Sequence, residues 1–141
     1  MPPELTLTDA PDAAAQAAIV SGLDRYNDEQ AGFADRKALA VLITDSETKA
    51  VIGGLLGRTS LGLLFIDILF VPEALRGKGL GGTIMHMAEA EAKRRGCMAT
   101  VLFTINFQAP GFYRRHGYSE LGEIPTHASG ISRFVMTKRL T

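Results

Sequence analysis

The sequence contains little cysteine and no excess of charge of either sign, and both shortages exclude classes of function. Cys97 is the only cysteine among 141 residues, so neither an internal disulfide framework nor a multi-thiolate metal site can form. Fifteen lysines and arginines balance fifteen acidic residues, so the chain lacks the net basic field that attracts nucleic acid. A local site must therefore recognise the ligand, and we expect no metal and no nucleic-acid partner.

Long apolar runs are also missing. The longest run, Leu61–Val71, is interrupted by Gly62 and Asp67 and is far shorter than the roughly 20 residues that span a bilayer. The first twelve residues carry acids and prolines, where a secretory signal would have a basic stretch and then an apolar run. We therefore expect a soluble, cytoplasmic protein that needs no membrane, with residues 1–141 forming a single domain.

Apolar periodicity predicts an α/β fold with a mixed sheet of six or seven strands. A dense apolar segment, Leu63–Val71, is typical of a central strand covered on both faces. Apolar residues recur at helical spacing at Leu80, Ile84, Met87 and Ala88, which predicts a helix with these residues on its core face, and Gly96 is a suitable helix end. The other expected strands are Glu4–Thr8, Lys37–Thr44, Ala50–Arg58, Met98–Ile105, Tyr118–Ile124 and Ile131–Lys138. The other expected helices are an alanine-rich one from about Pro11 to Tyr26 and a short one at Pro110–His116.

A glycine-rich loop separates the central strand from the strongest predicted helix. It reads Arg-Gly-Lys-Gly-Leu-Gly-Gly over Arg76–Gly82. A helix N-terminus offers free backbone N–H groups and the positive end of the helix dipole. Glycines allow an anion to approach this backbone, and Arg76 and Lys78 add positive charge. The loop therefore predicts a phosphate site; the alternative is a flexible basic turn.

Two common phosphate loops do not fit this segment. Gly77, Gly79 and Gly82 satisfy the dinucleotide spacing G-x-G-x-x-G. In the dinucleotide fold, however, the first glycine follows its strand closely and an acidic residue about 20 positions later holds the ribose. Here Pro72–Arg76 intervene, and Met98–Ile105 contains no acid. A nucleoside triphosphate loop needs Ser or Thr directly after its lysine, and this lysine is followed by glycine.

Two linked blocks of the sequence resemble the GNAT family of N-acetyltransferases. Arg76, Gly79 and Gly81 match its pyrophosphate motif, which is Arg or Gln, two residues, Gly, one residue, and Gly or Ala. A second block downstream resembles the family pattern Asn-x-x-Ala-x-x-aromatic-Tyr-x-x-x-Gly. Its matching residues are Asn106, Ala109, Phe112, Tyr113 and Gly117. The close agreement covers about residues 63–118, and the ends of the chain carry little motif information.

The resemblance implies the GNAT acyl-CoA N-acyltransferase fold, in which two central parallel strands splay apart and acetyl-CoA enters the cleft between them. These strands would be Leu63–Val71 and Met98–Ile105. The resemblance also implies that backbone groups at the end of the first strand, and Asn106 from the other side, hold the pantetheine arm of the cofactor. The full set of cofactor-binding residues that we expect is Leu69, Phe70, Val71, Arg76, Gly77, Lys78, Gly79, Leu80, Gly81, Gly82, Asn106, Ala109 and Tyr113.

Tyr113 and Asp67 are the expected catalytic residues. Tyr113 sits at the family position of the general acid that protonates the leaving thiolate; the alternative is a packing aromatic whose hydroxyl bonds to backbone. By the two-residue period of a strand, Asp67 shares a face with Phe65 and Leu69. Burial there would raise the pKa of its carboxyl toward that of a useful base. Asp67 could instead bind a cationic substrate or accept a neighbouring backbone N–H.

We assign no chemistry to the other reactive side chains. Cys97 is expected to be a small buried thiol. His86, His116 and His127 have no partners at metal-binding spacing and are expected to be surface or packing residues. The charged residues late in the second long helix, Glu89 and Glu91 among them, are expected to form a solvated face.

The expected function is N-acetyl transfer from acetyl-CoA to a primary amine of a small molecule or peptide, by direct attack in a ternary complex. A non-catalytic CoA-binding sensor or interaction module of the same fold is the alternative. Self-association is common in the family, so a homodimer is expected, with Ile131–Lys138 as the strand that could pair across a two-fold axis. The acceptor amine cannot be read from the sequence.

Overall fold

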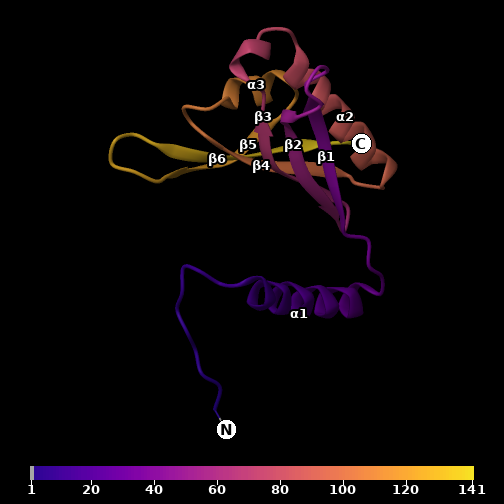
Figure 1. The fold of residues 1–141 in the computed structure, drawn as a ribbon, viewed down its shortest axis with the longest axis vertical. Coiled ribbons are helices and arrows are strands. Elements are labelled where there is room, and N and C mark those ends of the chain that lie inside the picture. The colour runs from indigo at the N-terminus through magenta and orange to yellow at the C-terminus, as the bar shows by residue number, and fades with distance from the viewer. Residues whose placement is uncertain (1) are drawn as a thin grey trace. The chain divides into compact units, whose positions relative to one another are not determined.

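The computed structural model describes residues 2–141 and divides into two compact units, the chain up to Ala34 and Asp35–Thr141 (Figure 1). The first unit contains one helix, α1 (Ala13–Ala31), which is capped at both ends. The Asp12 carboxylate accepts the Ala15 amide at 2.8 Å, and Gly32 ends the helix in the left-handed conformation. No helix within residues 2–141 has both the length and the hydropathy required to cross a membrane.

The strand expected at Glu4–Thr8 is wrong, because these residues adopt no regular structure. An isolated extended segment leaves its backbone groups without partners, and a strand forms only where a neighbour supplies them. The six described strands pair only with one another. Alternation of apolar and polar residues was therefore not sufficient to predict this element.

The second unit is a six-stranded mixed sheet flanked by helices, which confirms the predicted fold class. Its strand order is β1-β2-β3-β4-β6-β5, with only β3 and β4 parallel. Strand limits agree with the predicted ranges to within one or two residues. The strands are β1 (Lys37–Thr44), β2 (Val51–Ser60), β3 (Leu63–Phe70), β4 (Ala99–Ile105), β5 (Ser119–Pro125) and β6 (Ser132–Arg139). The helical elements are η1 (Glu73–Leu75), α2 (Leu80–Arg94) and α3 (Pro110–Arg115).

The hydrophobic core lies between α2 and one face of this sheet. Leu55 on β2, Leu64 on β3 and Met136 on β6 are fully buried there. Met85 and Ala88 cover them from α2. Burial alternates over Leu63–Ile66 in the first half of β3, because successive side chains of a strand point to opposite faces.

Two predictions about the face of α2 are wrong. Met87 was expected to face the core but is 54% exposed, and Met85 occupies the core instead. Glu89 was expected on the solvated face but is buried beside Ala88. The buried stripe keeps Ile84 and Ala88 as predicted and extends to Met85 and Glu89 instead of Met87. It accepts a carboxylate because partners from other elements neutralise that group, as described below.

The proposed pairing of the last strand across a two-fold axis is also wrong. β6 lies inside the sheet, where it pairs with β4 on one side and with β5 on the other. Its backbone groups are therefore already used. The edge strands of this sheet are β1 and β5.

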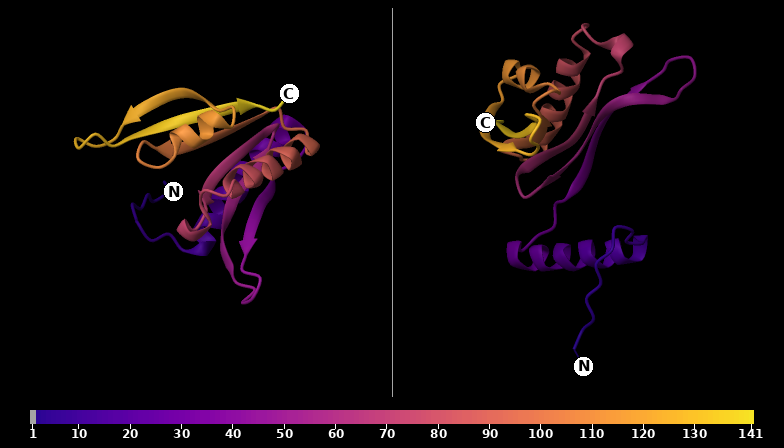
Figure 2. Two further views of the ribbon diagram at one scale, coloured as in Figure 1. Left: turned by 90° about the horizontal axis from the view of Figure 1, so that it is seen from above. Right: turned by 90° about the vertical axis from the view of Figure 1, so that its left-hand side faces the viewer.

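The central parallel strands separate after a short paired region. β3 and β4 are in register only from Leu63–Ile66 against Ala99–Leu102. Seen from above, the two halves of the sheet diverge (Figure 2). At the same point Ile66 pairs with Gly57 and Ile68 with Leu56, so Asp67 is an extra residue, a β-bulge. The sheet therefore opens beside Asp67, the one charged residue of β3.

Candidate active site

A cleft of about 850 Å³ occupies the opening between β3 and β4. Its walls come from the end of β3, the loop and first turn of α2, the end of β4, and α3. These segments are far apart in sequence and meet because parallel strands direct their carboxyl ends to the same edge of the sheet. The cleft brings together most of the residues predicted for the cofactor, together with both catalytic candidates.

The first turn of α2 presents backbone donors to this cleft. The first bond into the helix runs from the Thr83 amide to the Gly79 carbonyl at 3.1 Å. The amides of Leu80, Gly81 and Gly82 donate to no backbone carbonyl among residues 2–141. All three residues line the cleft. Three free N–H groups at the positive end of a fifteen-residue helix suit a phosphate group well.

Two glycines of this turn lie against Phe112 of α3 and against His116, which follows α3. A Cβ on Gly81 would lie 3.2 Å from the Phe112 ring, and a Cβ on Gly82 would lie 2.7 Å from Cε1 of His116. The Phe112 and His116 rings are themselves in contact, with centroids 4.6 Å apart. The sequence analysis explained these glycines only by the approach of an anion. The structure adds a second reason, because the missing side chains also leave room for the Phe112 and His116 rings.

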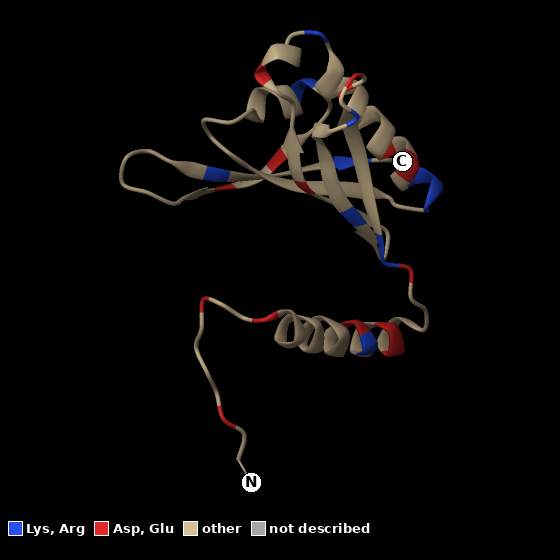
Figure 3. Cartoon of the chain, viewed as in Figure 1, with Lys and Arg blue, Asp and Glu red and all other residues tan. Residues whose placement is uncertain are grey.

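The cations near this turn differ in their placement. Gly77 and Gly79 both take left-handed backbone conformations, which shape the basic loop ahead of α2 (Figure 3). Nε of Arg76 donates to the Val71 carbonyl at 2.8 Å, so its guanidinium is held at the mouth of the cleft. The Lys78 side chain is exposed and does not line the cleft.

Sequence reasoning missed two cleft residues on α3, Arg115 and His116. The signal was available, since His116 lies three positions after Tyr113 and Arg115 three after Phe112, and such residues share a helix face. Other basic residues near the core are occupied elsewhere. Their acidic partners are Glu91 for Arg94 and Arg95, and Glu120 for Arg114.

Asn106 does not line the cleft in this structure. Its side-chain amide donates to the Gly130 carbonyl at 2.8 Å, and its side-chain oxygen accepts the Ser132 amide at 3.3 Å. The Asn106 side chain thus ties the end of β4 to the β5–β6 loop. Contact with the pantetheine arm remains a prediction, while Ala109, three residues on, does line the cleft.

Tyr113 lies in the cleft wall with only 8% of its surface exposed. Its ring meets Phe112 and Tyr118 edge to face, with centroids 5.2 Å and 5.8 Å away. Burial raises the pKa of its phenol. No hydrogen bond engages its hydroxyl within residues 2–141, so the packing alternative, a hydroxyl bonded to backbone, is not found there.

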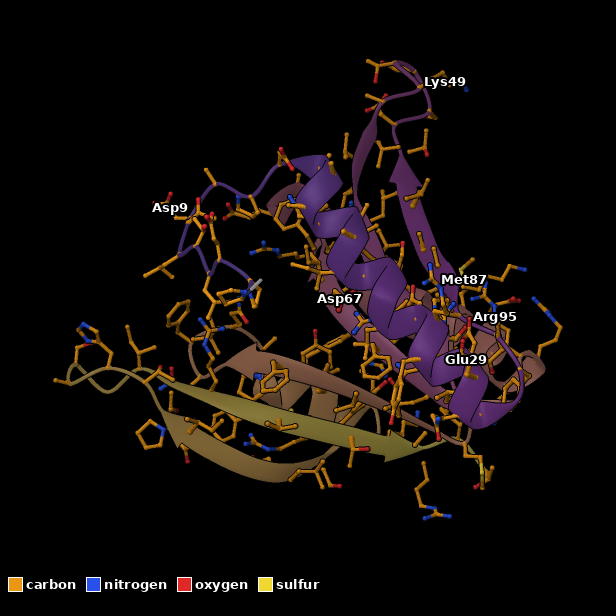
Figure 4. All side chains as sticks on the ribbon, turned by 90° about the horizontal axis from the view of Figure 1, so that it is seen from below. Asp9, Glu29, Lys49, Asp67, Met87 and Arg95 are labelled. Carbon is orange, nitrogen blue, oxygen red and sulfur yellow. The ribbon has the colours of Figure 1, made fainter. Side chains whose placement is uncertain are left out.

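Asp67 lines the cleft but is not buried, so the expected desolvation of its carboxylate is wrong. Half of its side-chain surface is exposed. Arg58 Nη1 contacts both carboxylate oxygens, at 2.8 and 3.1 Å, while its guanidinium lies 4.4 Å from the centre of the Phe65 ring. The bulge moves only Leu69, which lies on the core side opposite Leu55. Asp67 keeps the side of Phe65, where Arg58 contacts both side chains and the carboxylate stays half exposed (Asp67 is labelled in Figure 4).

Two buried tyrosines predict a steep loss of stability in alkaline solution. Burial raises the pKa of both Tyr113 and Tyr118. In the unfolded chain each phenol ionises near pH 10, so above about pH 10 the unfolded state releases protons that the folded state keeps. We therefore expect the free energy of unfolding to fall by about 1.4 kcal/mol per pH unit for each tyrosine as pH rises from there toward the folded pKa.

Urea unfolding at several alkaline pH values measures this slope. Tyr118→Phe should halve it, and an unchanged slope would contradict the assignment.

Comparisons with known proteins agree with this geometry. Residues 8–118 match the model of a family described as "Acetyltransferase (GNAT) family". The chain is 39% identical over 133 residues to acetyltransferase Atu2258 of Agrobacterium fabrum, covering 94% of this chain and 96% of that one. It is also 39% identical over 95 residues to the blasticidin-S acetyltransferase of Streptomyces morookaense, covering 67% and 70%. A crystal structure of a presumed acetyltransferase from Agrobacterium tumefaciens is 38% identical, covers 96% of this chain and 98% of that chain, and superposes with a TM-score of 0.88.

Proposed function

Because the chain belongs to the acetyltransferase (GNAT) family, whose members use acyl-CoA donors, we propose that it transfers the acetyl group of acetyl-CoA to a primary amine. The observation that carries this proposal is the set of three free amides at the start of α2, opening into a cleft that also contains Tyr113 and Asp67. A diphosphate on these amides would leave the rest of the cleft for the acyl-bearing arm and the acceptor.

Residues along the cleft fit the other parts of the donor. Acetyl-CoA, when bound, supplies an acetyl group activated as a thioester. Arg76 adds charge at the phosphate end. Beyond Ile66 the edge of β3 has no β4 partner, which supports the prediction that backbone groups of Leu69, Phe70 and Val71 pair with the pantetheine arm.

Tyr113 would act as the general acid. Its raised pKa keeps the phenol protonated through the neutral range, and its hydroxyl proton is not committed to another group within residues 2–141. It can therefore donate this proton to the thiolate that leaves when the amine attacks. A buried donor without competing partners is suited to this step because transfer costs no internal hydrogen bond.

Asp67 would receive or orient the amine. Its carboxylate faces the cleft and is paired with Arg58, which fixes its position without burying it. An exposed carboxylate attracts the ammonium form of the acceptor and can accept a proton from it, directly or through water. In either role, a substitution that removes the charge of Asp67 should lower kcat/KM for the amine more than it lowers the affinity for acetyl-CoA.

The acceptor that we propose is the primary amine of a small molecule or of a peptide, and the observations below favour the small molecule. The protein from Streptomyces named for acetylation of blasticidin S shares 39% identity over two thirds of this chain. The lining of the cleft contains exposed Phe103 and Phe107 as well as Asp67. Apolar faces beside one carboxylate suit a compact cation with an apolar body.

Release of free thiol from acetyl-CoA, measured against a panel of small amines and short peptides, tests the proposal. We expect amine-dependent release with at least one small amine. Binding of CoA without release for any amine would instead favour the non-catalytic module. Absence of CoA binding by folded protein would exclude both functions.

Arg76→Ala is expected to weaken CoA binding about tenfold, since it removes one charge-assisted contact to phosphate. The loss should shrink as salt is added, because the contact is solvent exposed. Isothermal calorimetry measures both effects. Arg139→Ala is the matched control, since Arg139 is exposed and outside the cleft. Equal affinities of the two variants would remove Arg76 from the site.

A further inference from the structure

A buried carboxylate on α2 has an arrangement that cofactor binding does not explain. Only 8% of the Glu89 side chain is exposed. One of its oxygens accepts the Tyr118 hydroxyl at 2.9 Å, and the other accepts the Lys138 ammonium at 2.7 Å. A carboxylate is costly to bury, and it is retained when each oxygen has a partner.

This cluster joins three elements around the turn that follows α3. Glu89 comes from α2, Lys138 from β6, and Tyr118 from the residue just before β5. Lys138 also packs against the turn, because a Cβ on Gly117 would lie 3.2 Å from Lys138 Cε. The ammonium of Lys138 lies 5.8 Å from the centre of the Tyr118 ring. The Tyr118 side chain is thus held at its hydroxyl and on its face.

Tyr118, which lies outside α3, contacts Tyr113 in turn. Its ring meets the Tyr113 ring edge to face, with an interplanar angle of 68°. Its backbone amide donates to the Tyr113 carbonyl at 3.0 Å. Because the single Tyr118 hydroxyl proton is given to Glu89, it is not available to Tyr113. The Tyr113 phenol therefore has a fixed wall behind it and no internal hydrogen bond to draw it from the cleft.

We propose that Glu89, through Tyr118, is a positioning residue for the Tyr113 phenol. This inference rests on the proposed function, in which Tyr113 is the proton donor. The physical reason is that proton transfer depends steeply on the placement of the donor. If Glu89 no longer holds the Tyr118 hydroxyl, the ring behind Tyr113 gains freedom, and the phenol spends less time in the productive position.

A double-mutant cycle tests this directly. Glu89→Gln and Tyr118→Phe should each lower kcat about tenfold and change the KM for acetyl-CoA by less than about twofold. In the Tyr113→Phe background, the same changes should cost less than about twofold, since their target is already absent. Glu91→Gln is the matched control, because Glu91 lies on the same helix and pairs with arginines away from Tyr118. Equal losses in both backgrounds would overturn the proposal.

A second measurement needs no activity. Protein labelled with fluorotyrosine contains three reporters, since the chain has three tyrosines, and the Tyr113 resonance is assigned by its loss in Tyr113→Phe. Glu89→Gln should shift or broaden the Tyr113 fluorine resonance, and Glu91→Gln should leave it in place. An unchanged Tyr113 resonance in Glu89→Gln and in Tyr118→Phe would overturn the proposal even if acetyl transfer were established. If the resonance shifts but no thiol is released with any amine, the coupling of Glu89 to Tyr113 through Tyr118 is supported and the proposed acetyl transfer is rejected.

Discussion

Tyr113→Phe is expected to lower kcat about 10²-fold, at the lower end of the range for loss of a general acid. The substitution removes one hydroxyl from a buried ring and leaves the edge-to-face contacts with Phe112 and Tyr118 intact. Binding of acetyl-CoA should therefore change little. The kinetic signature is a fall in kcat and kcat/KM together, as for an interaction made only in the transition state.

The pH dependence of this variant separates proton donation from packing. A general acid works only while protonated, so its contribution is lost as pH rises through its pKa. Burial raises the pKa of Tyr113, so wild-type turnover should persist to a higher pH than an exposed phenol would allow. The residual activity of Tyr113→Phe should lack this alkaline limb. Thiol release at saturating substrates across the alkaline range measures it, and an unchanged kcat with unchanged CoA affinity would exclude Tyr113 from the mechanism.

Gly54→Ala is expected to destabilise the protein by about 4 kcal/mol, through backbone strain and overpacking together. Gly54 has a φ of +135°, which side chains of L residues rarely adopt. A Cβ there would lie 2.1 Å from the Val41 carbonyl oxygen on the neighbouring strand. Backbone cannot move aside as a flexible side chain can, so β1 and β2 would have to separate.

Urea unfolding of Gly54→Ala against wild type measures the effect. Gly122→Ala is the matched control, because Gly122 is also in the sheet and a Cβ there would meet nothing within 4 Å. This variant should change the free energy of unfolding of the protein by less than about 0.5 kcal/mol. The consequence for function is indirect. β2 supports β3 through close backbone approach at Gly53 and Gly57, so CoA binding should fall with the folded fraction. Similar midpoints for the two variants would contradict the strained geometry.

Local sequence predicted much of the candidate site because a loop and the helix turn after it are built from neighbouring residues. The glycine-rich loop, the helix that follows it and Tyr113 in the second motif block were all predicted and all line one cleft. These features lie within short segments, where turn and helix preferences operate without distant partners. Asn106 was placed by the same local resemblance, and its side chain bonds elsewhere because Gly130 and Ser132 reach it from another loop.

Contacts between segments distant in sequence decided which side chains are buried and which groups they pair with. No pattern along α2 indicated that Glu89 turns inward, because its partners, Tyr118 and Lys138, lie 29 and 49 residues away in sequence. The environment of Asp67 was also misjudged, since its partner Arg58 comes from the adjacent strand and pairs with a carboxylate that stays half exposed. The sequence by itself predicted the residues of the proposed phosphate site and determined the order of most elements. Only the tertiary structure decided which charges are buried and which side chains share a face, because those outcomes depend on the register between strands and on groups that folding brings together.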